Sequence, residues 1–547
     1  MGQIEDVAFP RLTNTELAHV KPLATPCDYA DGETIFRVGQ ADIDLYIVES
    51  GEIKICNPTD GDRPLVTHGP GQFSGDIDLL TGRPVIVTAV AQGATRVWRV
   101  PNSQLRTLLN RVPSFGEKLI VAFTRRREML SQLGTLGLRV VGPGRCRDTN
   151  TVREFLYKNF VPFTWFDTET EAGRQMLVEL GSPRKTPAIE CGSGRVLVNP
   201  SLQELAAEAG IWRHCPSQDS DFVIVGAGPA GISAAVYAAS EGLSTLLLDK
   251  LGPGGQAGGS SRIENFIGFP AGLSGADLAT RGVLQMLKFG ARMVAPVAVE
   301  KLTPARSIDE LHALHLDCGA TIRCRVLLLA LGVRWRRLEA AGADRLAGNG
   351  IYYACTTVEA DLYDGADVAV VGGGNSAGQA AMFLAECCPT RQVHLLVRRT
   401  LGAGMSDYLT QRIRATANVV IHEQTEIAAL HGDHRIEAID LRNSAAKAPL
   451  HLPCSAVFVF IGAEPAAEWL PAEIARDANG YVLTGTDVVR SGLWPRGDRD
   501  PCPLETTVPG ILAAGDIRSG STKRVGFAVG DGSLAVTCAH RLLSITR

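Results

Sequence analysis

The chain has 547 residues, with 54 Lys and Arg against 58 Asp and Glu and a formal net charge of −4. This balance excludes the basic surface typical of a nucleic-acid-binding protein, and the apolar runs reach only about half of the roughly 20 residues that a membrane helix needs. Because the N-terminus also has no apolar signal segment, we expect a cytoplasmic protein of about three or four domains, without membrane or nucleic-acid partners.

The 13 cysteines are scattered along the chain, without a C-x-x-C pair or the spacing of a metal site. This pattern is typical of a reducing compartment, in which cysteines pack as small apolar residues. The sequence therefore predicts neither a disulfide framework nor a metal centre.

Residues 1–135 are predicted to form a small antiparallel β-barrel followed by helices. The strand-like segments DLYIVES, GEIKIC and TRVWRV alternate with glycine-containing turns, and the helical stretch SQLRTLLNRVPSFGEKLIVAFTRRREML follows them. Short strands at this spacing are typical of all-β domains. The order resembles the cyclic-nucleotide-binding domain, with landmarks at Gly32-Glu33, Gly51 and Phe73-Ser74-Gly75-Asp76.

This resemblance implies a phosphate site, but two of its residues differ here. In that family an Arg and a helix N-terminus hold the cyclic phosphate, and a Glu takes the ribose hydroxyl. Here the acid is Asp76, and Arg83 precedes Pro84, whereas the family's Arg follows that Pro and is replaced by Val85. A buried phosphate without its guanidinium loses a strong charge-assisted pair. We therefore favour a structural or interaction barrel, with cyclic-nucleotide binding as the alternative.

Residues 136–214 are predicted to follow the order β-α-β-α-β-β-α, which resembles the thioredoxin/glutaredoxin fold. Thr186-Pro187 would match that family's cis-proline. Where the family has C-x-x-C, this chain has Cys146-Arg147-Asp148-Thr149. One cysteine cannot form the internal disulfide of dithiol exchange, so we expect a docking or spacer domain. A monothiol role for Cys146 is the alternative.

A dinucleotide-binding unit follows a polar linker. The segment DFVIVGAGPAGISAAVYAASEGLSTLLLDK is a strand, a glycine turn, a helix and a second strand that ends in an acid. The glycines of G-x-G-x-x-G permit a tight turn, a close approach of the pyrophosphate and close helix–strand packing, while the acid binds a ribose hydroxyl. The contacts expected from this unit are Gly226, Gly228, Pro229, Ala230, Gly231, Asp249 and Lys250.

From this point to the C-terminus the sequence resembles the low-molecular-weight thioredoxin reductase family. The segments Gly254-Gly255-Gln256 and Ile263-Glu264-Asn265-Phe266 look like the stretch beside that family's flavin, and VPGILAAGDI (508–517) looks like its second FAD motif. The resemblance implies an FAD-binding domain, residues 219–335 and 462–547, divided by an insertion. The further FAD contacts expected are Gly255, Gln256, Asn265, Gly332, Gly515 and Asp516.

The insertion, residues 336–461, contains a second strand–turn–helix unit, DVAVVGGGNSAGQAAMFLAE. The next strand ends in Arg398-Arg399, where an NAD-binding unit would carry an acid. Guanidinium groups pair with a 2′-phosphate that a carboxylate would repel, so the sequence predicts NADPH as the second cofactor. The contacts expected are Gly372, Gly374, Asn375, Ser376, Ala377, Arg398 and Arg399.

The thiol pair of the thioredoxin reductase family is incomplete in this chain. The family's NADPH domain opens with C-A-T-C-D, and this chain has Ala354-Cys355-Thr356-Thr357-Val358-Glu359 at that place. Cys355 takes the first cysteine position and Val358 replaces the second. A catalytic role for Cys355 therefore stays open beside the interpretation that we favour, a small residue packed near the isoalloxazine.

The sequence thus predicts an α/β protein with two nested, doubly wound dinucleotide-binding domains, preceded by the β-barrel and the thioredoxin-like domain. The expected function is that of an NADPH-dependent FAD oxidoreductase of the thioredoxin-disulfide reductase type. Its acceptor is a disulfide protein, a small redox protein or a small molecule. Alternatives are an NADPH:ferredoxin or flavodoxin-type reductase without thiol chemistry, and a nucleotide-gated redox sensor. The resemblance also implies a homodimer whose NADPH domain rotates.

Overall fold

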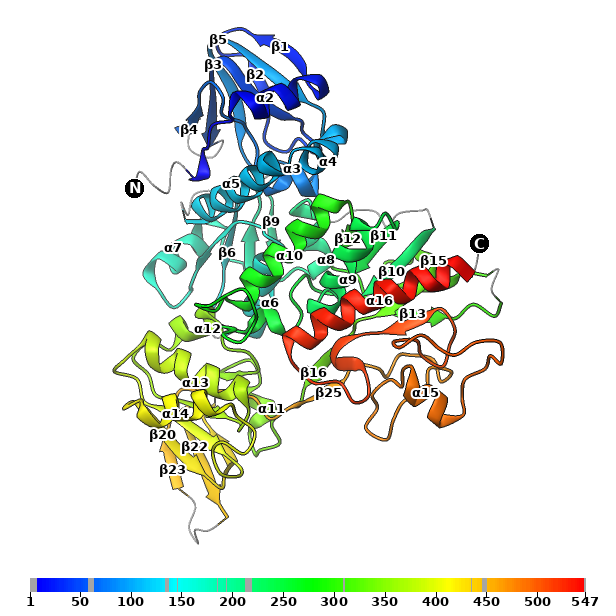
Figure 1. The fold of residues 1–547 in the computed structure, drawn as a ribbon. Coiled ribbons are helices and arrows are strands. Elements are labelled where there is room, and N and C mark those ends of the chain that lie inside the picture. The colour runs from blue at the N-terminus through cyan, green and yellow to red at the C-terminus, as the bar shows by residue number, and fades with distance from the viewer. Residues whose placement is uncertain are drawn as a thin grey trace.

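The structure is a computed structural model with four blocks, of which the fourth is inserted into the third (Figure 1). The N-terminal sheet lies at one end, and the first block contacts both the second block and the larger of the two α/β units. No helix among the described residues is long and apolar enough to cross a membrane. The structure describes residues 7–57, 63–132, 137–144, 146–183, 185–192, 194–211, 219–307, 310–433, 435–444 and 450–545.

The first block is an antiparallel sheet packed against helices, around a core that includes Phe73, Phe115 and Phe123. The predicted helical stretch divides at Pro113, which has no backbone N–H to donate. The strands are β1 (Thr25–Tyr29), β2 (Thr34–Phe36), β3 (Leu45–Asn57), β4 (Arg63–His68) and β5 (Thr88–Val100). The helices are α2 (Asn14–Val20), η1 (Lys21–Leu23), α3 (Ile77–Thr81), α4 (Asn102–Arg111) and α5 (Pro113–Gln132).

The predicted turn between DLYIVES and GEIKIC is wrong, because both segments belong to the single strand β3. The register of β3 against β5 shifts between Val48 and Ser50 and again between Ser50 and Glu52. Gly51 has a φ of 77°, and a Cβ there would lie 2.6 Å from the carbonyl oxygen of Ala94. This glycine therefore accommodates a bulge in a continuous strand instead of a turn.

The second block has the predicted element order, with a four-stranded sheet in the order β7-β6-β8-β9. Strands β6 and β7 are parallel, the other two pairs are antiparallel, and the Thr186–Pro187 peptide bond is cis as expected. Its assignment to the thioredoxin family stays a prediction. The elements are β6 (Leu138–Val141), α6 (Arg147–Lys158), β7 (Phe163–Phe166), α7 (Glu171–Glu179), β8 (Ala188–Glu190), β9 (Val196–Val198) and α8 (Leu202–Glu208).

The third block is built on a seven-stranded sheet in the order β12-β11-β10-β15-β14-β13, with β26 also paired to β15. Helices α9 and α16 lie side by side on this sheet (Figure 1). Strands β11 and β26, most of β10 and the second half of β15 are buried and apolar because both faces of the sheet are covered there, whereas β13 and the first half of β15 have exposed residues. The strands are β10 (Ser220–Val225), β11 (Thr245–Leu248), β12 (Arg292–Val294), β13 (Val299–Thr303), β14 (His312–Leu316), β15 (Thr321–Leu329) and β26 (Ile511–Ala513). The helices are α9 (Pro229–Ser240), η2 (Ala257–Gly259), α10 (Gly275–Phe289), α15 (Thr486–Ser491), η3 (Gly515–Ile517) and α16 (Val525–Ile545).

The fourth block is inserted into the third through the antiparallel pair β16 (Val333–Trp335) and β25 (Ala463–Pro465). It contains a parallel sheet in the order β17-β24-β18-β19-β20 and a small antiparallel sheet, β21-β22-β23. The strands are β17 (Ile351–Tyr352), β18 (Val368–Val371), β19 (Val393–Val397), β20 (Val419–Glu423), β21 (Thr425–His431), β22 (Ala438–Asn443), β23 (Leu450–Pro453) and β24 (Ala456–Val459). The helices are α11 (Ala343–Leu346), α12 (Thr357–Leu362), α13 (Asn375–Cys387) and α14 (Asp407–Ala415).

Candidate functional site

The first glycine turn joins β10 to α9 and needs glycine at two positions for packing. Gly226 has a φ of 108°, and a Cβ there would lie 2.3 Å from the carbonyl oxygen of Ala330. A Cβ at Gly231 would lie 1.9 Å from the carbonyl oxygen of Gly226. At Gly228 the nearest atom to an added Cβ is the Cα of Gly255, at 3.9 Å. Open space thus faces the helix N-terminus, which fits the cradle that a pyrophosphate needs.

Asp249 lies at the end of β11, directly beside this turn. Its Oδ2 accepts a hydrogen bond from the backbone N–H of Ala227 at 2.8 Å. Its Oδ1 accepts from the N–H groups of Leu251 and Gly252, both at 2.8 Å. The carboxylate therefore organises two loops where the ribose is expected, and the neighbouring Lys250 is exposed.

The second predicted FAD motif meets the first in space. A Cβ at Gly515 would lie 3.1 Å from the Cβ of Ala230, although the two residues are far apart in the chain. The N–H of Gly515 donates to Asp531 at 2.9 Å. Burial raises the pKa of Asp516, while Lys523 opposes the shift. Both motifs therefore converge on one site, as a single dinucleotide requires.

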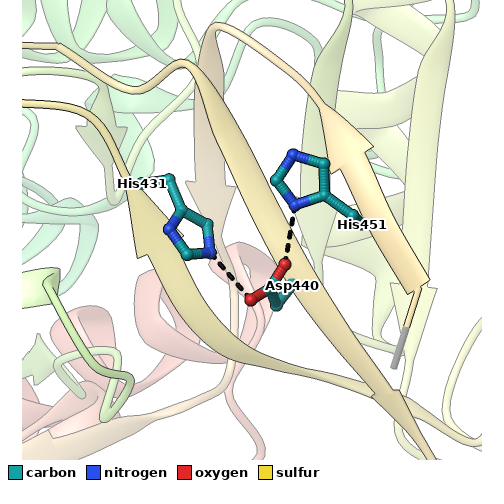
Figure 2. Close-up of side chains that lie close together, drawn as sticks. All are labelled: His431, Asp440 and His451. Atoms are coloured by element: carbon teal, nitrogen blue, oxygen red, sulfur yellow. Dashed lines mark hydrogen bonds and ion pairs between the residues drawn. The ribbon is translucent and has the colours of Figure 1, made fainter. Parts of the chain in front are cut away.

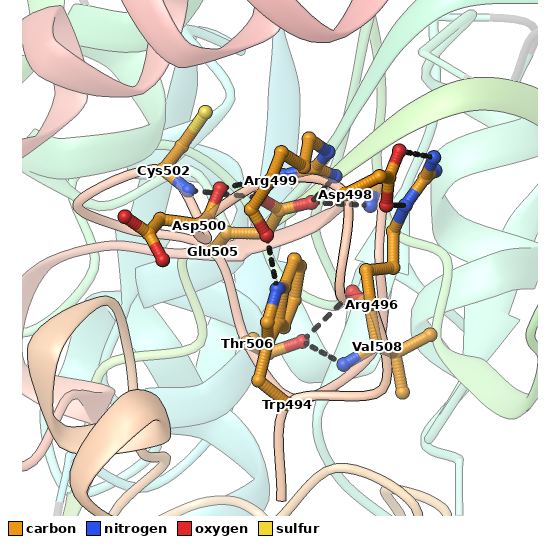
Figure 3. A network of polar contacts seen from close by, with 10 residues as sticks. Trp494, Arg496, Asp498, Arg499, Asp500, Cys502, Glu505, Thr506 and Val508 are labelled. Carbon is orange, nitrogen blue, oxygen red and sulfur yellow. Dashed lines mark hydrogen bonds and ion pairs between the residues drawn. The ribbon is translucent and has the colours of Figure 1, made fainter.

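A buried ion pair supports the segment that leads into β26 (Figure 3). The carboxylate of Glu505 is fully buried and accepts from both Nη atoms of Arg499 at 2.7 Å. It also accepts from the N–H groups of Cys502 at 2.8 Å and Gly510 at 3.0 Å. The sequence did not predict this cluster, which fixes the backbone of the segment before Asp516.

The segment expected beside the flavin packs against the first glycine turn. A Cβ at Gly255 would lie 2.8 Å from the Cα of Gly228, so the two backbones are close. Gln256 donates through Nε2 to the carbonyl oxygen of Val333 at 3.2 Å. Gly332 turns the chain into β16 with a φ of 61°. Asn265 is exposed and lines a hollow of about 360 Å³.

The second glycine turn, between β18 and α13, repeats this geometry. A Cβ at Gly372 would lie 2.4 Å from the carbonyl oxygen of Phe460, whereas one at Gly374 would meet only the carbonyl oxygen of Gly404, at 4.0 Å. Asn375 is held by Ser406, whose N–H donates to its Oδ1 at 2.7 Å. Ala377 is buried in the helix. Exposed positions remain at Ser376, Arg398 and Arg399.

Cys355 lies between the two dinucleotide sites and is 3% exposed, within the apolar core of the fourth block. Burial raises the pKa of its thiol, and Glu359 and Cys387 add to the shift. The backbone of Cys355 pairs with Ser260, so this segment lies against the stretch expected beside the flavin. Glu359 is itself engaged, because its Oε2 accepts from the N–H of Thr356 at 2.8 Å. The burial supports the packing interpretation of Cys355.

An ion pair that the sequence did not predict joins the two large units. Glu264, in the segment beside the predicted flavin site, lies 3.1 Å from Nη1 of Arg412 on α14. Arg412 also pairs with Glu386. Together with the contact between Cys355 and Ser260, this pair defines the orientation of the inserted unit.

In the N-terminal sheet, an internal cation faces the acid of the predicted nucleotide site. Nη2 of Arg127, on α5, lies 2.7 Å from Asp76 and 2.6 Å from Asp78. Burial raises the pKa of Asp76, whereas Arg127 lowers it. All three side chains are largely buried. The acid is thus paired within the protein, without a ribose.

Arg83, which precedes Pro84 where the family's Arg would follow it, faces the second block. Its Nη1 donates to the carbonyl oxygen of Asn159. The side chain of Asn159 in turn donates to the carbonyl oxygen of Leu251 at 2.9 Å. Val85, in the place of the family's Arg, is buried. The segment that would bind a cyclic phosphate therefore contacts a neighbouring block, which supports the interpretation of the barrel as an interaction domain.

Cys146 precedes α6 as its N-cap residue, and residues on both sides of it contact the inserted unit. A Cβ at Gly144 would lie 2.7 Å from Leu362, and one at Gly348 would lie 2.7 Å from the Cβ of Arg147. This block therefore contacts α12 and its surroundings, and its role as a docking or spacer domain stays a prediction. A monothiol role for Cys146 stays an alternative.

One α/β unit is divided by a second, inserted unit, and each has an open glycine turn at a helix N-terminus, so the fold defines a protein with two dinucleotide sites. Residues 220–532 match the family model described as pyridine nucleotide-disulphide oxidoreductase, and residues 26–112 match the cyclic nucleotide-binding domain. Because the first match spans more than half of the chain, the chain belongs to the pyridine nucleotide-disulphide oxidoreductase family.

The relatives place it near the thioredoxin reductases. The 34.2 kDa protein in rubredoxin operon of Clostridium pasteurianum is 32% identical over 323 residues, 59% of this chain and 97% of that protein. Thioredoxin reductase of Treponema pallidum is 31% identical over 322 residues, 59% of this chain and 96% of that protein. The crystal structure of T. acidophilum thioredoxin reductase has 26% identity and a TM-score of 0.53, covering 60% of this chain and all of that one.

These comparisons confirm the predicted fold class and the predicted oxidoreductase of thioredoxin reductase-like type. That group uses FAD and NADPH. The cyclic-nucleotide-binding resemblance of the N-terminal block is also confirmed.

Proposed function

We propose that this protein is an NADPH-dependent flavoprotein oxidoreductase that passes electrons to a disulfide or another acceptor. FAD would be held by Gly226–Gly231, Asp249 and Asp516, and NADPH by Gly372–Ala377 with Arg398-Arg399. The bound cofactors supply hydride transfer from the nicotinamide to the flavin. The observation that carries the proposal is the pair of open glycine positions, Gly228 and Gly374, each at the N-terminus of a helix of 12 or 13 residues.

The choice of NADPH over NADH rests on Arg398 and Arg399. Both are exposed directly after β19, so their guanidiniums are free to meet a 2′-phosphate. The test compares rates of flavin reduction by NADPH and NADH in the wild type and in the double variant Arg398→Gln/Arg399→Gln. We expect the wild type to prefer NADPH and the variant to lose most of that preference. An equal rate with NADH in the wild type contradicts the assignment.

The burial of Cys355 supports a second candidate route, in which electrons leave without this thiol. A thiol with a raised pKa is protonated at neutral pH and is a poor nucleophile. The test is reoxidation of the reduced protein by disulfides and by one-electron carriers, repeated with Cys355→Ser. If disulfides reoxidise the wild type and the variant fails, Cys355 is catalytic. If both proteins behave alike, the acceptor takes electrons by another route.

We also propose that the chain forms a homodimer, by analogy with its thioredoxin reductase relatives. Light scattering of the purified protein gives the mass directly, and a monomer at micromolar concentration contradicts this assignment.

A further inference from the structure

A histidine–aspartate–histidine cluster lies on the small sheet β21-β22-β23, remote in sequence from the residues assigned to either cofactor. Asp440 is paired directly with His451 on one side and with Ala429 on the other. Ala429 lies two residues before His431 on the same strand, and alternate residues of a strand share a face. The three polar side chains therefore lie on one face of the sheet (Figure 2).

The opposite face of these strands is apolar and fixed in the core. Leu430, Ile439 and Leu441 are each 3% exposed or less and belong to one buried cluster. Packing of this apolar face therefore fixes the positions of the strands that carry the polar cluster. The polar face itself is open, because His431 and His451 are exposed and Asp440 is half-buried.

The carboxylate of Asp440 lies between the two imidazoles. Nε2 of His431 is 2.7 Å from Oδ2, and Nδ1 of His451 is 2.8 Å from Oδ1. One nitrogen from each ring and one carboxylate oxygen all lie within 4.8 Å of one another. Among the described residues, no other group of three His, Cys, Asp or Glu side chains meets this spacing.

We propose that His431, Asp440 and His451 bind a divalent metal ion, with Zn²⁺ as the best match. Two imidazole nitrogens and a carboxylate oxygen are ordinary zinc ligands. Bonds of about 2.0–2.2 Å in a tetrahedral site separate the ligand atoms by about 3.3 Å. In the structure, Nε2 of His431 is 2.7 Å from the Asp440 carboxylate, and no two of the three ligand atoms are more than 4.8 Å apart. The tetrahedral separation lies between these two distances. Small side-chain rotations therefore suffice.

Metal binding at this place has a simple proton balance. Each imidazole shares a proton with Asp440 in the structure. In each imidazole the ion takes the ring nitrogen that faces Asp440, so the proton of a neutral ring moves to the other nitrogen of that ring, and only the extra proton of a charged ring passes to solvent. The fourth position remains open to water. Next to the cluster, His431, Asp344 and Arg345 line an open hollow of about 600 Å³, so water has access on this side. An ion bound by three strands would cross-link the sheet and stabilise the folded state.

The direct test is equilibrium dialysis of the FAD-loaded protein against Zn²⁺, with metal analysis and X-ray absorption at the zinc edge. We expect the cluster to bind one zinc ion per chain, with nitrogen or oxygen ligands at about 2.0–2.2 Å. The exposed thiols Cys318 and Cys387 are competing sites, and they would show zinc–sulfur distances of about 2.3 Å. Absence of zinc, or sulfur ligation alone, overturns the proposal.

Variants separate the cluster from other sites on the surface. His431→Ala/His451→Ala removes two ligands, and Asp440→Asn keeps the side-chain shape but removes the charge. We expect affinity to fall on the order of tenfold or more in each, and the zinc-dependent rise in Tm to disappear. His19→Ala is the matched control, because His19 is an exposed histidine of α2 outside the cluster. Undiminished zinc binding in the double variant contradicts the assignment.

Discussion

Arg127 lies 2.7 Å from the carboxylate of Asp76, the acid at the place where a cyclic-nucleotide-binding domain meets the ribose. A buried acid already paired with a guanidinium has no charge to offer a ligand, and separating the pair costs several kcal/mol. We therefore predict that cyclic AMP and cyclic GMP at millimolar concentration leave the Tm unchanged. A ligand at 100 times its Kd would stabilise the protein by about 2.7 kcal/mol. A rise of several degrees in Tm contradicts this account.

Weakening the ion pair between Glu264 and Arg412 should free the inserted unit. The side chains are 22% and 35% exposed, so the pair contributes about 1 kcal/mol or less. Glu264→Gln should leave the fold intact. It should accelerate flavin reduction by up to about fivefold, because it loosens the orientation that holds Cys355 against Ser260.

Rapid mixing of the oxidised protein with NADPH measures this rate. Glu171→Gln is the control, because it removes an exposed ion pair with Arg174 in the second block. An unchanged or lower rate in Glu264→Gln, with Glu171→Gln equal to the wild type, shows that the pair does not restrain the domain.

Glu505→Gln should be strongly destabilising, because it leaves the guanidinium of Arg499 without a counter-charge in a buried site. Removing one partner of a buried pair costs about 3–5 kcal/mol. Because the network leads into β26 and Asp516, we also expect weaker retention of FAD. Urea unfolding and the flavin content after dialysis measure the two effects. Asp498→Asn, in the exposed pair with Arg496 of the same loop, should leave both nearly unchanged.

His312 should make the protein less stable in acid. Burial lowers its pKa to about 4 from the ordinary 6.5, and its Nδ1 accepts from the N–H of Ala305. The neutral ring is therefore favoured in the folded state. The contribution of the neutral ring to the free energy of unfolding is complete above pH 6.5. It is lost as the pH falls toward 4, and the total loss is about 3 kcal/mol.

His312→Asn keeps an acceptor for Ala305 but does not titrate. Urea midpoints between pH 6.5 and 4.5 should therefore fall less steeply in His312→Asn than in the wild type. Parallel slopes for the two proteins rule out His312 as the cause.

Local patterns predicted the two dinucleotide units well, because a strand, a glycine turn and a helix follow one another within a short stretch of sequence. The need for glycine at Gly226 and Gly372 is a property of the local backbone. The same property misled the interpretation of Gly51, since a positive φ serves a bulge as well as a turn.

Contacts between distant segments could not be predicted in this way. Arg127 meets Asp76 only after α5 packs on the sheet, and Glu264 meets Arg412 only after the inserted unit is oriented. The cluster around Asp440 could have been predicted from the sequence only in part. Strand alternation could have placed His431 and Asp440 on one face, but the register of three strands was needed to add His451.

The most direct test of the account is an anaerobic titration of the purified protein with NADPH, followed by flavin absorbance. We predict bound FAD that bleaches with NADPH in the wild type. In Gly374→Val, whose side chain fills the open second turn, FAD should remain bound and bleach with dithionite but not with NADPH. Protein without bound flavin, or flavin that NADPH leaves oxidised in the wild type, contradicts the proposed function.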